Sequence, residues 1–99
     1  MRPLGDLTHL ACRLAAQFAR EREHETVDAI ASHAFEAARI ATEVRARGPT
    51  AAKLKKLGAV VAPYGASIVD NRDPEGMMLG LRFRGGRYSS GIRDIMFLV

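Results

Sequence analysis

Three histidines and one cysteine are the residues best suited to bind a metal or to act as nucleophile and base: His9, His24, His33 and Cys12. His9 and Cys12 are three residues apart, so a helix would place them on one face. A zinc site needs three or four ligands, and no second pair of this kind completes one. A Cys–His nucleophile pair needs a third, orienting group, which the sequence does not indicate. We therefore expect incidental surface histidines, no metal, no cofactor and no catalytic residue.

Three acidic residues, Asp70, Asp73 and Glu75, invite comparison with a calcium-binding loop. The EF-hand pattern requires oxygen ligands at alternate positions and a Glu at the twelfth. Here Arg72 interrupts the loop, and the twelfth position counted from Asp70 is Leu81. Asp and Glu beside Pro74 are explained by turn formation, so we expect no calcium site.

Positive charge is concentrated in the second half of the chain. Residues 1–48 hold seven Lys/Arg and seven Asp/Glu, whereas residues 49–99 hold eight and four, which accounts for the net charge of +4. Such an asymmetry is typical of a protein with an anionic partner, and equally of a charged strand face that resists edge pairing. The residues that we expect to bind a partner are Arg72, Arg82, Arg84, Arg87, Tyr88, Lys53 and Lys56.

A β-hairpin over residues 66–84 is the most specific structural signal. Asp-Pro-Glu-Gly at residues 73–76 suits a type I turn, because Pro presets φ and Gly accepts a positive φ. After the turn, Met77, Leu79, Leu81 and Phe83 alternate with Met78, Gly80, Arg82 and Arg84. This period of two predicts an apolar face and an arginine-bearing face.

Two helices precede the hairpin. Leu7, Leu10, Leu14 and Phe18 predict a helix over residues 6–22, capped by Asp6 or Thr8, with Arg13, Gln17 and Arg20 off the apolar stripe. Thr26 and Gly48 are suited to cap the second helix. Its expected stripe is Val27, Ile30, Ala34, Ala37, Ala41 and Val44, widened by Phe35 and Ile40. These helices predict an αα-hairpin, with a longer coiled coil as the alternative.

The expected fold is a single α+β domain over residues 1–99, with a helical half 1–57 and a sheet half 58–99. A short third helix capped by Thr50, an apolar strand at residues 59–62 and a strand at 87–90 complete an antiparallel sheet of 3–4 strands. The terminal apolar run would be buried in this sheet or across a homodimer interface: Ile95, Met96, Phe97, Leu98 and Val99. No apolar run approaches the roughly 18 residues of a membrane span, so we expect a cytoplasmic protein.

Tyr64-Gly65, the turn Asn-Arg-Asp-Pro-Glu-Gly at residues 71–76 and the strand that follows resemble a pattern of small phage and prophage proteins. The resemblance covers residues 64–91, with Glu75 where those proteins carry Arg and Met77 where they carry an aromatic residue. It implies a mobile-element accessory protein that acts by binding host machinery, as anti-CRISPR proteins do. The expected function is therefore a non-enzymatic inhibitor of a host protein or nucleoprotein complex.

Two other functions stay open. The first is a small basic protein that binds nucleic acid with the same arginine-rich hairpin face, where Arg side chains contact phosphates and Tyr88 stacks on a base. The second is a small RNase-type enzyme with arginines around a phosphate. The basic half contains no histidine to act as its base, so the sequence favours a protein that is not an enzyme.

Overall fold

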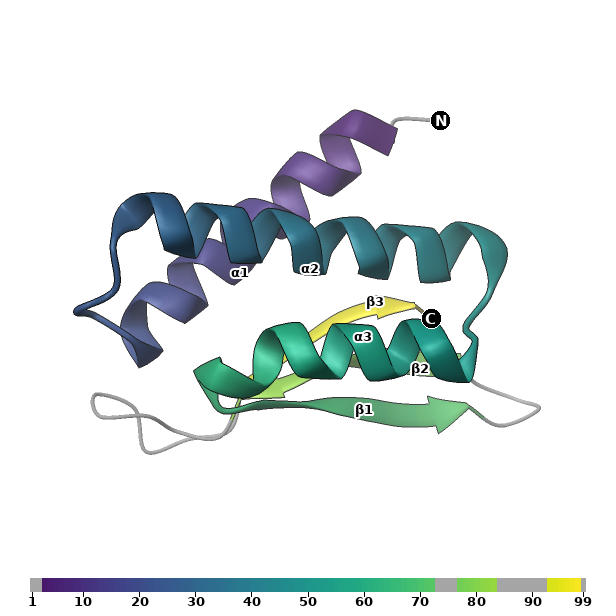
Figure 1. Cartoon of the computed structure of the whole chain (residues 1–99). Helices are drawn as coiled ribbons and strands as arrows, with labels where there is room; N and C mark the ends of the chain where they lie inside the picture. Colours follow the sequence, from purple (N-terminus) through teal and green to yellow (C-terminus); the bar gives the residue numbers. More distant parts are fainter. Residues whose placement is uncertain (1–2, 73–76, 84–92, 99) are drawn as a thin grey trace.

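The computed structural model describes residues 3–72, 77–83 and 93–98 of the 99-residue chain. Its elements are α1 (Pro3–Glu21), α2 (Val27–Arg47), α3 (Ala51–Val61), the 3-10 helix η1 (Ala62–Tyr64), β1 (Ala66–Arg72), β2 (Met77–Phe83) and β3 (Arg93–Leu98). The α+β class and the antiparallel sheet agree with the prediction. Figure 1 shows α1 crossing behind α2, and α3 lying beside β1. None of the described helices is long and apolar enough to cross a membrane.

Helix α1 packs against α2 through the predicted apolar stripe, and Leu10, Leu14 and Phe18 are buried. The helix begins earlier than predicted, at Pro3, so Asp6 and Thr8 lie inside it and cannot be its caps. The prediction that Gln17 lies off the stripe is wrong, since the residue is only 6% exposed. Its side-chain Nε2 donates a hydrogen bond to Glu21 Oε1 at 3.0 Å, which satisfies the amide in this position.

Helix α2 has both predicted caps. The Thr26 hydroxyl accepts a hydrogen bond from Ala29 N, and Gly48, at φ 91°, donates its N–H to Val44 O. Two predicted core positions are wrong, because Val27 is 80% exposed and Phe35 is 49% exposed. The buried stripe is made mostly of alanines, including Ala37. Phe35 lies two residues from Ala37, which is about 200° around the helix, and therefore points away from the core.

Helix α3 is capped by the Thr50 hydroxyl, which accepts a hydrogen bond from Lys53 N at 3.2 Å. The strand predicted at residues 59–62 is wrong, because the helix continues through Gly58 to Val61 and η1 begins at Ala62. Leu57 and Val61 are four residues apart and both fully buried, so tertiary packing overrides the weak helix propensity of glycine. Gly65, at φ 72°, then turns the chain into β1.

The predicted hairpin is confirmed in its two strands. Strands β1 and β2 pair antiparallel from Ala66 opposite Phe83 to Arg72 opposite Met77. The predicted turn, residues 73–76, lies outside the described residues, as does the strand predicted at 87–90. Strand β3 pairs with the other side of β2, which gives the order β1-β2-β3.

One face of the sheet forms the core with the helices. As the alternation predicts, Leu81 and Phe83 are buried, whereas Arg82 between them is partly exposed on the opposite face. Ile95 of β3 is also buried, at 3% exposure. These three side chains belong to one cluster with residues of all three helices. The sheet is therefore covered by helices on this face, and the opposite face has no helix on it among the described residues (Figure 1).

Candidate functional site

Tyr64 is a buried residue whose hydroxyl reaches a polar cluster. The residue is 1% exposed, and its ring stacks on Phe18 with ring centroids 3.9 Å apart and planes 3° apart. Phe18 in turn lies 5.9 Å from Phe83 of the sheet. A buried tyrosine normally finds a hydrogen-bond partner for its hydroxyl. Here the partners are Glu25 and His33, and we call these three residues the Tyr64 cluster.

The Tyr64 cluster joins three segments: Glu25 lies in the turn after α1, His33 on α2 and Tyr64 in η1. The Tyr64 hydroxyl donates its proton to Glu25 Oε1. His33 Nδ1 lies 2.5 Å from the same hydroxyl oxygen and 3.5 Å from Glu25 Oε1. Because the Tyr64 hydroxyl already donates its one hydrogen to Glu25, the hydroxyl oxygen acts as the acceptor toward His33, and His33 Nδ1 is the protonated donor. The unprotonated atom of neutral His33 is then Nε2, on a side chain that is 47% exposed.

The electrostatics of the cluster follow from these contacts. The hydrogen bond from Tyr64 lowers the pKa of Glu25 below its usual value, and Arg22 and His33 act in the same direction. Arg22 Nε lies 3.8 Å from Glu25 Oε2. Burial, with the neighbouring Glu25 carboxylate, raises the pKa of Tyr64 to about 12. Glu25 is thus the charged acceptor of the cluster and Tyr64 its neutral donor over the physiological range.

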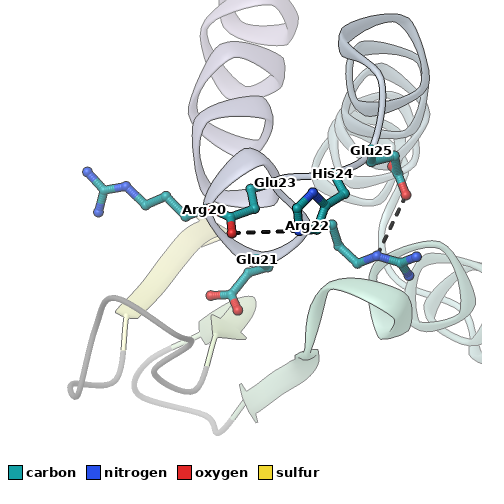
Figure 2. Close-up of a pocket in the computed structure, with 6 residues that line it drawn as sticks. All are labelled: Arg20, Glu21, Arg22, Glu23, His24 and Glu25. Atoms are coloured by element: carbon teal, nitrogen blue, oxygen red, sulfur yellow. Dashed lines mark ion pairs between the residues drawn. The ribbon is translucent and has the colours of Figure 1, made fainter.

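A pocket of about 300 Å³ lies beside the cluster at the turn between α1 and α2, lined by Arg20, Glu21, Arg22, Glu23, His24 and Glu25. Figure 2 shows the two ion pairs along this turn, His24 with Glu23 and Arg22 with Glu25. The Arg20 side chain points away from the others. The residues that line the pocket carry charges of both signs.

The cluster is better suited to join segments than to perform catalysis. Its one hydroxyl belongs to Tyr64, whose raised pKa makes it a weak nucleophile near neutral pH. His9 and Cys12 are exposed on α1, and no group of three metal-binding side chains occurs in the described residues. The interpretation of His33 as an incidental surface histidine is wrong, because Tyr64 and Glu25 bind its Nδ1. His24, whose side chain is 89% exposed, does fit that interpretation.

The structure divides the predicted partner-binding residues between two places. Arg82 lies opposite Ser67 at the beginning of β1, on the sheet face without helices. Arg72 ends β1, about 17 Å further along the strand at 3.3 Å per residue. Lys53 and Lys56 lie on α3, on the helical side of the sheet. Arg84, Arg87 and Tyr88 lie outside the described residues.

A second charged feature was missed in part by the sequence reasoning. The residues 44–69 contain five Lys/Arg and no Asp or Glu, and all five lie where α2 ends and α3 begins. We call them the basic corner: Arg45, Arg47, Lys53, Lys55 and Lys56. Arg45, Arg47, Lys55 and Lys56 are exposed, while Lys53 Nζ lies 3.7 Å from Glu43 Oε1. The acid-free run was visible in the sequence and could have identified this group.

The carboxylate of Glu43 makes ion pairs with two basic residues. Glu43 Oε2 lies 3.9 Å from Arg39 Nη1, and its Oε1 faces Lys53 across the α2–α3 packing. The carboxylate therefore interacts with α3 and with the preceding turn of α2.

No family model, curated protein or solved structure that was compared with the chain matches it.

Proposed function

We propose that this protein is a non-enzymatic interaction protein that binds a protein or nucleoprotein complex through the sheet face without helices, called here the open face. The observation that carries the proposal is the one-sided packing of the sheet. Leu81, Phe83 and Ile95 join the helices in the core, and the described residues place no helix on the other side. A two-layer domain with one sheet face free of helices offers a surface for a partner, and on this face Ser67 is exposed whereas Val69 is only 8% exposed.

Charge indicates what kind of partner fits the open face. Arg82 lies on it between Ser67 of β1 and Asp94 of β3 in the strand register, and the period of two assigns Arg84 to the same face, with Arg87 and Tyr88 in the predicted hairpin that follows. Arginine and tyrosine are enriched in protein interfaces, and a basic face steers association with an acidic partner. The proposed partner is therefore a protein with an acidic surface. The resemblance to phage proteins adds the finer proposal that binding inhibits a bacterial host complex, as anti-CRISPR proteins do.

The test uses two matched substitutions of exposed serines. Ser67→Glu places a carboxylate next to Arg82 on the open face, whereas Ser32→Glu makes the same change on the solvent side of α2. Tagged protein is used to capture partners from a nuclease-treated bacterial lysate, and the affinity of each variant for the captured protein is then measured. We expect Ser67→Glu to weaken binding at least tenfold and Ser32→Glu to leave it unchanged.

Two results would contradict the proposal. Equal affinities of the two serine variants would show that the partner does not use the open face. Loss of every partner on nuclease treatment would favour direct nucleic-acid binding as the main function instead. Circular dichroism melting of both variants distinguishes a local effect on binding from unfolding, since both serines are exposed and neither substitution should change Tm by more than a few degrees.

A further inference from the structure

We infer that the basic corner is a second binding surface, separate from the open face, and that it binds the phosphate backbone of nucleic acid without regard to sequence. The local fold holds its five residues together. Gly48 ends α2 with its N–H bonded to Val44 O, and Thr50 begins α3 two residues later by capping Lys53 N. The basic end of α2 and the basic first half of α3 are thus joined by a short connection that contains the C-cap of one helix and the N-cap of the other.

The charges on α3 are arranged against the usual preference of a helix. A helix N-terminus carries partial positive charge, so acidic residues are favoured in the first turn and lysines are not. Helix α2 follows the rule with Asp28. Helix α3 has no acidic residue in its first turn, and Lys53, Lys55 and Lys56 occupy its first half. Lys55, Lys56 and the helix dipole therefore add to one positive potential at this end of α3, whereas Lys53 is paired with Glu43.

The exposed side chains of the corner favour nucleic acid over protein. Lysine is depleted in protein interfaces, which need apolar or aromatic anchors at their centre. The large hydrophobic residues exposed in the described chain are Val27 and Phe35. Phe35 lies ten residues before Arg45, about 15 Å along α2, so it cannot anchor a partner at the corner. Lysines and arginines without such an anchor suit phosphates, which bind mainly through charge.

This surface is geometrically independent of the open face. Lys55 and Lys56 lie on α3, which packs against β1 from the helical side, and Gly58 of the same helix faces Ile68 across that contact. A nucleoprotein target could thus be contacted on its protein by the open face and on its nucleic acid by the corner. Because different residues form the two surfaces, either one can fail while the other binds.

The test measures fluorescence anisotropy of a labelled mixed-sequence duplex DNA, and of one of its single strands, over a range of salt concentrations. The variant is Lys55→Gln with Lys56→Gln, and the control is Arg13→Gln with Arg20→Gln, which removes the same charge from exposed positions of α1. For five phosphate contacts on duplex DNA, the slope of log K against log salt should be no steeper than about −4.5. The lysine variant should reduce this slope by about 2 and weaken binding, and the arginine control should change neither.

Three results would overturn the inference: no salt-dependent binding by the unmodified protein, equal binding by the lysine variant, or equal losses in variant and control. Poly-glutamate serves as the probe for an acidic protein partner. If it binds the corner with a dependence on Lys55 and Lys56 while neither form of DNA binds, the occupant is an acidic protein and the inference is wrong. Unchanged Tm values of both variants exclude unfolding as the cause, because all four substituted residues are exposed.

Discussion

Replacing Tyr64 by Phe removes the hydroxyl that joins η1 to α2 and to the turn after α1, while the ring that stacks on Phe18 stays. The hydroxyl donates to a carboxylate and accepts from His33. Hydrogen bonds to charged groups contribute roughly 1.5–3 kcal/mol, and neutral ones about 1 kcal/mol. The partners are partly exposed and regain water when the hydroxyl is lost, so we expect a net loss of about 1–2 kcal/mol. For a chain of this size, this corresponds to a decrease in Tm of roughly 4–16 °C.

The pH dependence tests whether Glu25 is the partner responsible. The Tyr64 hydroxyl lowers the pKa of Glu25 in the folded state, so this stabilisation is complete above the usual glutamate pKa of 4.5 and is lost as the pH falls through the lowered pKa. The Tm difference between the unmodified protein and Tyr64→Phe should therefore be largest near neutral pH and decrease in strong acid. A double-mutant cycle with Glu25→Gln, followed by thermal melting, isolates the coupling between the two side chains.

The reasoning would be refuted if Tyr64→Phe melted within about 2 °C of the unmodified protein, well inside the range that its hydrogen bonds predict. It would be refuted equally if the Tm difference were the same at pH 3 and pH 7. If Tyr64→Phe left Tm unchanged and its effect added to that of Glu25→Gln without coupling, the hydroxyl would be hydrogen-bonded to water and not to Glu25.

Three further predictions concern single residues. Tyr64 should ionise near pH 12 in a spectrophotometric titration, and ionisation near pH 10 would contradict the burial of its hydroxyl. Because the pKa is raised in the folded state, the stabilisation by this hydroxyl is complete below pH 10 and is lost as the pH rises to about 12. Gly48→Ala should lower the free energy of unfolding by about 1 kcal/mol, because φ at Gly48 is 91°. Gly58→Ala should raise it by roughly 0.5–1 kcal/mol, because Gly58 is helical and the new Cβ would lie 3.9 Å from Ile68, an ordinary contact. Urea denaturation that changed both stabilities in the same direction would be inconsistent with these conformations. Phe18→Ala should cost about 3–5 kcal/mol and Phe35→Ala less than 1, since the first is fully buried and the second is 49% exposed; equal losses of Tm would place Phe35 in the core.

Local signals in the sequence determined much of the helical half and of the hairpin. The hydroxyls of Thr26 and Thr50 cap helices because a cap needs only a side-chain oxygen two or three residues before an amide. Gly48 accepts the positive φ that ends α2 for the same local reason. The burial of Leu81 and Phe83 follows from the period of two in a strand. The charge asymmetry, and with it the basic corner, is also a property of the sequence.

Only the tertiary structure decided which residues meet across the chain. Phe35 fits an apolar pattern but is exposed, because the close-packed alanines of α2 determine which side of that helix faces the core. Gly58 and the residues after it read locally as a helix end and a strand, yet burial of Leu57 and Val61 keeps them helical. His33 and Tyr64 are 31 residues apart and Glu25 and Tyr64 are 39 apart, so no spacing rule relates them. Their cluster exists because packing of Tyr64 on Phe18 brings η1 beside the turn between α1 and α2, where a carboxylate and a histidine can share the hydroxyl.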